Sequence, residues 1–472
     1  MTSRRSAWLA TALGAALLAG CAAGPRPAAE SAPAQAAAAV TGIDIPIEYY
    51  RLDNGLRVVL SRDPGAPTVT AGVWYRIGFR NEPRGRTGFA HLFEHLMFQG
   101  SVNLGKMEFI RLVEGNGGIL NGSTRFDYTN YFQVVPAHTL ETVLWAEADR
   151  MRGLAITQDN LDNQRSVVQN EVRDNVLNRP YGGFPWLSLP QLANENWHNA
   201  HNFYGDMADL DAATLADVRG FFERYYAPGN AVLVVAGDFD RDQVRGWIER
   251  YFGPVPARAT PPRPDVSEPR QQAGKRHTQT DALAPRPGLA LAWHVPPRGT
   301  PEHYVFGLLD QILLQGEDSR LWQRLVRERG HAGEVAGGVN LLGNLFDYDG
   351  PMLWMVYLVH DDPAAADAIL ADLDAEIARM QREPPSAAEL ERALTKLRAG
   401  LYDLAGSNTR FGLTNLLAAF ALFDDDPARI NRLEERFRAI TPEQIRQVAA
   451  DWLRPENRTI LTLAPGRTAG QP

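Results

Sequence analysis

The sequence predicts an α+β protein with two related domains, each a mainly antiparallel sheet packed with helices, and three observations lead to this prediction. The chain has 472 residues, of which 44% are hydrophobic and 22% charged, which suits a globular protein with more than one core. Residues 255–285 are dense in proline with polar residues between, as in an interdomain linker. The segments on either side of this linker end alike, which indicates an internal duplication.

Residues 1–20 are predicted to be an export signal. Two arginines precede an apolar run over 7–19, which is shorter than the roughly 20 residues that cross a bilayer. The run ends in Leu-Ala-Gly-Cys, which resembles the bacterial lipobox, whose cysteine is lipidated and becomes the mature first residue. A signal peptide with an incidental cysteine is the alternative. Because Cys21 is the only cysteine, we expect a lipid anchor there.

The segment after the signal is predicted to be a tether. Residues 21–44 are rich in alanine and proline, a composition that cannot bury a core. By resemblance to other lipoproteins, Ala22 rather than aspartate after the cysteine favours the outer membrane over the inner. We therefore expect the protein in the bacterial cell envelope, lipid-anchored and facing the periplasm.

The folded body is expected to begin near Ile45. An Asp-Asn-Gly sequence at 53–55 lies between two strand-like runs and indicates a β-hairpin. Residues 68–77 read as a further strand with apolar residues on one face. Helical patterns then alternate with strands, which predicts sheets covered by helices.

Each half ends in an amphipathic helical pattern, a turn and an apolar strand. These are residues 214–226, 228–230 and 231–235 in the first half, and residues 441–453, 455–457 and 459–463 in the second. Two common helix–turn–strand units could also match by coincidence. A duplication is the favoured interpretation, with domains at 45–254 and 286–466 and a tail at 467–472.

Composition excludes several kinds of partner and site. The formal charge of −8 and the pI near 5.8 argue against a protein that binds nucleic acid. A single cysteine allows neither an intramolecular disulfide nor a cysteine-rich metal site. Any metal must be held by histidine and carboxylate side chains.

The strongest candidate for such a site lies at 88–100, a segment of helical composition that ends at glycine. On a helix, His91 and His95 at positions i and i+4 lie on one face, and Glu94 at i+3 shares that face. Two imidazoles can hold one Zn²⁺ beside a carboxylate, with a further position left for water. The alternative is a polar helix stripe with two ordinary histidines.

A third ligand has to come from another segment. Glu171 is the candidate, on a predicted helix from residue 161 that ends before Pro180. It lies at the edge of this helix's apolar stripe. By its spacing alone, Glu171 could therefore also be an ordinary acidic residue at the boundary between the buried and the exposed face of the helix.

Together these residues resemble the pitrilysin/insulinase family of zinc metallopeptidases. The resemblance rests on His-Leu-Phe-Glu-His at 91–95 followed by Glu171, and it extends through the segments 117–124, 127–131, 148–150, 226–230 and 318–321. It implies half of a clamshell, with one zinc per chain on His91, His95 and Glu171 and with Glu94 as general base. Zinc lowers the pKa of its water and Glu94 takes the proton, so that hydroxide can attack a peptide carbonyl.

The resemblance also implies that the substrate binds as an added strand along a sheet edge. Leu120, Asn121 and Gly122 match that edge, and Phe98 is a further candidate for substrate binding. A glycine there permits close approach of a backbone, and main-chain hydrogen bonds bind peptides without demanding one sequence. A simple turn at Asn121-Gly122 is the alternative.

Two positions depart from the family pattern. Many members have a second glutamate where this chain has Gln164, which can still hydrogen-bond a ligand or its neighbour. The family also places an arginine and a tyrosine, seven residues apart, opposite the zinc, and the alignment puts Leu353 and His360 there. We therefore expect a dimer, either with a related subunit that supplies this pair or as a homodimer.

The predicted function is that of an exported zinc metalloendopeptidase acting on peptides or unfolded protein segments. The alternative is a non-catalytic peptide-binding subunit of a related heterodimer, in which the zinc is structural. Two further histidines, His198 and His201, lack a nearby acid in helical register and are predicted to be loop residues.

Overall fold

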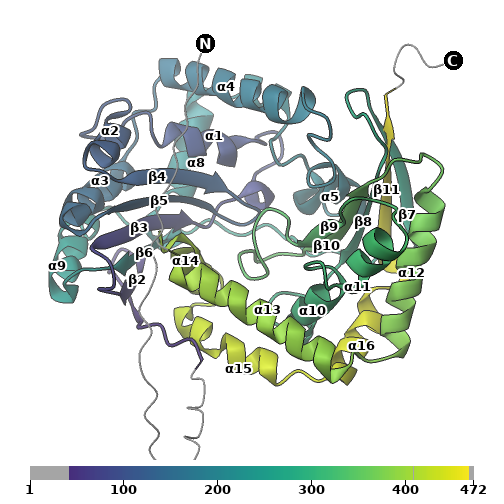
Figure 1. Cartoon of the computed structure of the whole chain (residues 1–472). Helices are drawn as coiled ribbons and strands as arrows, with labels where there is room; N and C mark the ends of the chain where they lie inside the picture. The colour runs from purple at the N-terminus through teal and green to yellow at the C-terminus, as the bar shows by residue number, and fades with distance from the viewer. Residues whose placement is uncertain (1–41, 408, 467–472) are drawn as a thin grey trace, which may run out of the picture. The chain divides into compact units, whose positions relative to one another are not determined.

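The computed structural model describes residues 42–407 and 409–466, so Cys21 lies outside it. Within the described residues, a first sheet of six strands has the order β1-β2-β6-β3-β5-β4 (Figure 1). Its strands are β1 (Glu48–Arg51), β2 (Arg57–Arg62), β3 (Thr68–Tyr75), β4 (Ile119–Thr124), β5 (Thr129–Pro136) and β6 (Ala231–Gly237). Only the β2–β6 pair is parallel, and β4 forms one edge. The predicted hairpin is confirmed, because β1 and β2 pair across a turn that contains Gly55 at φ 91°.

Helices of the first half pack on one face of this sheet. They include α1 (Phe89–Leu96), α2 (Glu108–Gly115), α3 (Leu140–Arg152), α4 (Gln158–Val172), α8 (Leu215–Tyr225) and α9 (Arg241–Phe252). Helix α1 lies against β4 and β5 and also against α4. This packing brings two segments that are far apart in the sequence to the same end of the sheet.

A second sheet of five strands has the order β7-β11-β8-β10-β9. The strands are β7 (Lys275–Asp281), β8 (Gly288–His294), β9 (Ala336–Val339), β10 (Leu353–Val359) and β11 (Arg458–Pro465). This sheet also contains one parallel pair, β7–β11, next to antiparallel strands. The predicted fold class, two mainly antiparallel sheets packed with helices, is confirmed.

On each sheet packs one helix that comes from the other half of the chain. Helix α14 (Phe411–Phe423), from the second half, packs on β2, β3 and β6, and helix α5 (Ser188–Ala193), from the first half, packs on β8 and β11 (Figure 1). The side chains of Arg57 and Arg76 donate to the carbonyl oxygens of Ala421 and Leu422 in the last turn of α14. These are carbonyls that an isolated helix leaves without partners, so the first half caps a helix of the second.

The remaining helices of the second half cover the face of the second sheet that lies opposite α5. They are α10 (Pro301–Leu313), α12 (Ala366–Arg382), α13 (Ala387–Gly406) and α16 (Pro442–Trp452), with the shorter α11 (Arg320–Trp322) and α15 (Leu433–Arg438). Helices α6 (Trp197–Ala200) and α7 (Met207–Asp211) belong to the first half.

Within the described ranges, no helix has the length and apolar character needed to cross a membrane.

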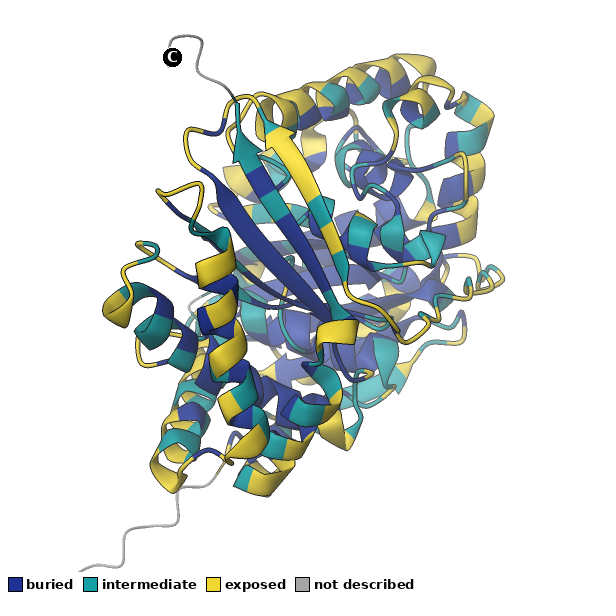
Figure 2. Ribbon diagram, turned by 90° about the vertical axis from the view of Figure 1, so that its right-hand side faces the viewer, coloured by how far each residue is buried: buried dark blue, intermediate teal, exposed yellow. Residues whose placement is uncertain are grey.

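The predicted linker, residues 255–285, contains a strand that the sequence pattern did not reveal. Residues 275–281 form β7, an edge strand whose side chains are largely exposed, next to the buried strands of the second sheet (Figure 2). Its polar sequence lacks the apolar alternation of a half-buried strand, because neither face of this edge is well covered. The proline-rich stretch without helix or strand is therefore residues 255–274. The domain boundaries at 45–254 and 286–466 stay a prediction.

Candidate metal centre

Helix α1 places the two histidines of the sequence motif on one face, with His91 buried and His95 half-buried. The residue before the helix, Gly88, occupies the N-cap position with φ 81° and has no side chain to cap the helix. The carboxylate of Glu82 takes over this role, because its oxygens accept hydrogen bonds from the backbone N–H groups of Gly88 at 2.9 Å and Ala90 at 2.6 Å. Glu82 is fully buried, and burial raises its pKa.

The side chains of His91, His95 and Glu171 converge on one point. The two Nε2 atoms are 3.4 Å apart, and Oε2 of Glu171 lies 3.6 Å from Nε2 of His91 and 3.3 Å from Nε2 of His95. Within the described ranges, these three residues are the one group of histidine, cysteine and acidic side chains close enough to share a metal ion. Helix α4 supplies Glu171, so the α1–α4 packing assembles the group.

The charges of this group also suit a cation. Burial lowers the pKa of His91, so its imidazole is neutral at pH 7 and keeps a lone pair. A hydrogen bond with His95 lowers the pKa of Glu171, which is therefore ionised. Ring nitrogens and a carboxylate oxygen that face one another this closely are the donor set that zinc prefers.

Glu94 lies beside this group and is held by a neighbouring strand. The hydroxyl of Thr124, in β4, donates a hydrogen bond to Oε2 of Glu94 at 2.7 Å. A Cβ atom at Gly122 would lie 3.2 Å from Cγ of Glu94. The strand can therefore approach the carboxylate closely because residue 122 has no side chain.

A cavity of about 450 Å³ opens next to the metal-ligand group. His91, Glu94 and Glu171 line it, together with a wall of large apolar side chains from both halves: Phe79, Trp186, Phe203, Tyr204 and Leu342. The ring of Tyr204 meets the imidazole of His91 edge to face, with centroids 5.2 Å apart. The cavity can thus receive a large side chain beside the three converging ligand atoms.

The predicted substrate edge is a strand and not a turn. Asn121 and Gly122 lie in β4, opposite Phe132 and Tyr131 of β5, and β4 ends the first sheet. Leu120 is half-buried, and Asn121 and Gly122 line the cavity. The other candidate, Phe98, packs against Phe109 and Tyr131 and is absent from the cavity wall.

Other predicted residues lie away from the converging atoms. Gln164 is buried in α4, and its amide donates to Asn163 at 2.9 Å. Leu353 and His360, where the family pattern has arginine and tyrosine, are both buried in the second half, at 3% and 1% exposure. Neither side chain is available to a substrate at the cavity.

Two site residues were missed from the sequence. Glu82 and Thr124 contact α1 and Glu94 from positions that no local pattern connects to the motif. The one available signal was that Gly88, the N-cap residue of α1, has no capping side chain, so the first N–H groups of the helix need an acceptor from another segment. The prediction of a loop is wrong for His198, which lies in helix α6 with its Nδ1 2.9 Å from the carbonyl oxygen of Arg80. His201 follows this helix in a bend, as predicted, and its Nε2 lies 3.5 Å from Oε2 of Glu82.

Comparison with known proteins is consistent with this geometry. The model "Insulinase (Peptidase family M16)" matches residues 57–180, and "Peptidase M16 inactive domain" matches residues 212–397. The zinc protease PqqE of Helicobacter pylori is 25% identical over 429 residues, which are 89% of this chain and 93% of that protein. The uncharacterized zinc protease YmxG of Bacillus subtilis is 25% identical over 299 residues, 61% of this chain and 69% of that one.

Solved structures show the same fold. A protease from Helicobacter pylori superposes with a TM-score of 0.82 at 24% identity and covers 89% of this chain and 100% of its own. The periplasmic protease PqqL from Escherichia coli superposes with a TM-score of 0.71 at 20% identity, over 90% of this chain and 48% of its own. From the motif, the fold and these matches together, the chain belongs to the pitrilysin/insulinase family, peptidase family M16.

Proposed function

We propose that this protein is a zinc-dependent endopeptidase that hydrolyses peptides or unfolded protein segments. The observation that carries the proposal is the convergence of His91, His95 and Glu171 beside Glu94 and the open edge of β4. A structural zinc site has no need of a free carboxylate or of a strand edge next to it.

The distances support zinc as the metal. Ligands placed about 2.0–2.1 Å from zinc in a tetrahedron lie about 3.3 Å from one another. The corresponding separations among His91, His95 and Glu171 are 3.4, 3.6 and 3.3 Å. When bound there, zinc would supply Lewis-acid chemistry, which polarises a carbonyl group and makes water more acidic.

The chain's own residues supply binding and proton transfer. An extended peptide would pair with the free edge of β4, and its backbone would hydrogen-bond to the strand whatever its side chains are. Glu94 would accept the proton of the attacking water, with Thr124 holding one carboxylate oxygen by the hydrogen bond at 2.7 Å. The large apolar side chains of the cavity, such as Trp186 and Tyr204, would contact a bulky substrate side chain.

We also propose that a partner completes the site. Arginine and tyrosine are missing at Leu353 and His360, and the large apolar residues Val102, Met107 and Ile119 are exposed before and at the start of β4. The fold neighbour PqqL is about twice as long as the matching region, which leaves room in that protein for a second body of similar size. The partner would be a related subunit that supplies the pair, or a second copy of this chain.

The competing function is a non-catalytic peptide-binding subunit with structural zinc. It is favoured by the match of residues 212–397 to a domain described as inactive and by the missing arginine and tyrosine. Glu94 beside the metal ligands favours the peptidase. Peptide turnover with and without a chelator separates the two functions.

Removal of one ligand tests the metal site. His95→Ala is expected to lower bound zinc from about one per chain to near zero, because two remaining ligands hold zinc poorly. Metal analysis of the purified mature chain measures this. His138→Ala, at an exposed histidine of the same half, is the control and should keep its zinc. Full zinc content in the His95 variant would refute the assignment.

Removal of the proposed base tests catalysis. Glu94→Gln should keep zinc and the melting temperature but lower peptide hydrolysis by at least ~10²-fold, the scale of positioned general-base catalysis. The matched control is Glu223→Gln, at an exposed glutamate on α8. Near wild-type, chelator-sensitive activity in the Glu94 variant would mean that another residue takes the proton.

Lipidation of Cys21 is the proposed anchor to the bacterial envelope. Cys21→Ser should move the protein from the membrane fraction to the soluble fraction, because acyl chains provide the membrane affinity. Fractionation of cells that express the full chain measures this, with Ala38→Ser in the tether as the control. A variant that stays as membrane-bound as wild type would contradict the anchor.

Mass and activity of the isolated chain test the partner. The mature chain alone should be a dimer in solution, or a monomer with little activity until a related subunit is added. Light scattering gives the mass, and an unfolded peptide serves as substrate. A monomer that cleaves at rates typical of enzymes, about 1–10³ per second, would show that no partner is needed.

A further inference from the structure

A second cavity lies where the two halves of the fold meet. Its volume is about 240 Å³, and none of its lining residues lines the cavity at the metal centre. One wall is formed by Arg51 of β1, Arg57 of β2 and Arg76, which directly follows β3. The proline-rich segment 260–266 forms another wall, and residues 349–350 of the second half form a third. Its volume is about half that of the cavity at the metal centre, which suits a small ion better than a peptide segment.

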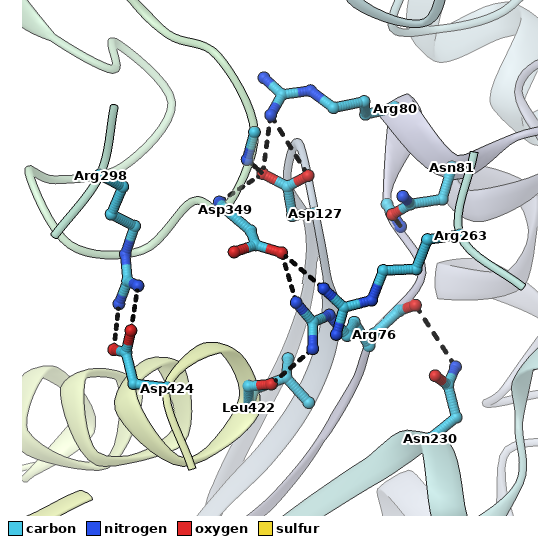
Figure 3. A network of polar contacts seen from close by, with 12 residues as sticks. Arg76, Arg80, Asn81, Asp127, Asn230, Arg263, Arg298, Asp349, Leu422 and Asp424 are labelled. Carbon is cyan, nitrogen blue, oxygen red and sulfur yellow. Dashed lines mark hydrogen bonds and ion pairs between the residues drawn. The ribbon is translucent and has the colours of Figure 1, made fainter. Parts of the chain in front are cut away.

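The walls of this cavity carry an excess of positive charge. Four arginines line it: Arg51, Arg57, Arg76 and Arg263. Asp349 is shared between two of them, since Oδ2 pairs with Nη2 of Arg76 and lies 3.1 Å from Nη1 of Arg263 (Figure 3). A single carboxylate therefore serves two guanidinium groups.

The other carboxylate in the wall is already paired. Asp127 binds Arg80 at 3.1 Å and also accepts hydrogen bonds from the backbone N–H groups of Asp349 and Gly350, at 2.7 and 3.3 Å (Figure 3). Arg51 pairs with Asp425 at 2.6 Å, and both of these side chains are more than half exposed. Within the described residues, neither acid of the cavity wall pairs with the remaining arginine.

Arg57 is that remaining arginine. It is 8% exposed, and it forms no ion pair within the described residues. Its Nε and Nη1 donate to the carbonyl oxygens of Ala231, Ala421 and Leu422 at 3.2–3.3 Å, while Nη2 has no hydrogen-bond partner in that part of the chain. Burial lowers its pKa to about 10, with Arg76 and Arg51 lowering it further and Tyr49 and Asp425 opposing the shift, so the side chain is still charged at pH 7.

We propose that this cavity is a binding site for a small multivalent oxyanion such as inorganic phosphate. A buried cation costs free energy unless an opposite charge accompanies it, and carbonyl dipoles do not neutralise a full charge. Guanidinium groups bind phosphate through paired, charge-assisted hydrogen bonds. Arg57, Arg76 and Arg263 offer such groups from three different parts of the wall.

A bound anion would connect segments that are distant in the chain. Arg57 lies in β2 and Arg76 directly follows β3, while Arg263 belongs to the proline-rich segment and Asp349 to the second half. Because the site exists only in the folded protein, the anion would stabilise the folded state by mass action. Such binding would be independent of any peptidase activity, because no residue of this cavity lines the cavity at the metal centre.

The test measures binding of inorganic phosphate to the mature chain by calorimetry and by the shift of its melting temperature, at constant ionic strength. Phosphate should bind and raise the melting temperature, whereas chloride should not. Arg57→Gln and Arg263→Gln should each weaken binding about tenfold or more, the effect expected for a lost hydrogen bond to a charged group. Arg263 is 58% exposed, so its variant should fold even where the Arg57 variant is unstable.

Removal of the competing carboxylate should have the opposite effect on phosphate binding. Asp349→Asn removes the carboxylate that competes for Arg76 and Arg263, so it should tighten phosphate binding. Arg276→Gln, at a side chain 59% exposed on β7, is the matched control and should leave binding unchanged. The proposal is overturned if phosphate acts no differently from chloride, if the Arg263 variant binds normally, or if Asp349→Asn weakens binding.

Discussion

The packing of α1 against α4 is the contact on which the candidate metal centre depends. Helical geometry puts His91 and His95 on one face, but only the neighbouring helix brings Glu171 to within 3.6 Å of both. The orientation of α1 is in turn determined at its start, where the buried carboxylate of Glu82 binds two backbone N–H groups. Three separate stretches of chain therefore determine where three ligand atoms meet.

Local patterns predicted the parts of this arrangement that are local. The spacing of His91, Glu94 and His95, the hairpin around Gly55 and the repeated helix–turn–strand units all follow from residues close together in sequence. Glu171 could be assigned as a metal ligand only by resemblance to the family, because many acidic residues lie at the edge of a helix's apolar stripe without binding a metal. Contacts such as those of Glu82 join positions without a common periodicity, so no pattern could have shown them. The polar strand β7 was missed because an exposed edge leaves no apolar alternation.

The two cavities differ in their chemistry because they are built from different side chains. At the metal centre, imidazole nitrogens and carboxylates face one another beside aromatic rings, which favours a cation. At the junction of the halves, guanidinium groups outnumber carboxylates, although the chain as a whole carries a formal charge of −8. Local arrangement rather than net charge decides which ion each cavity suits.

The packing of one helix from each half on the other half's sheet makes the two halves dependent on each other. Without α14 the first sheet would lose cover over β2, β3 and β6, and without α5 the second sheet would lose cover over β8 and β11. A gene divided at the proline-rich segment would therefore encode two fragments, each exposing apolar strands that the other must cover. Each half therefore depends on the other for part of its core, and separation of the halves would leave both incomplete.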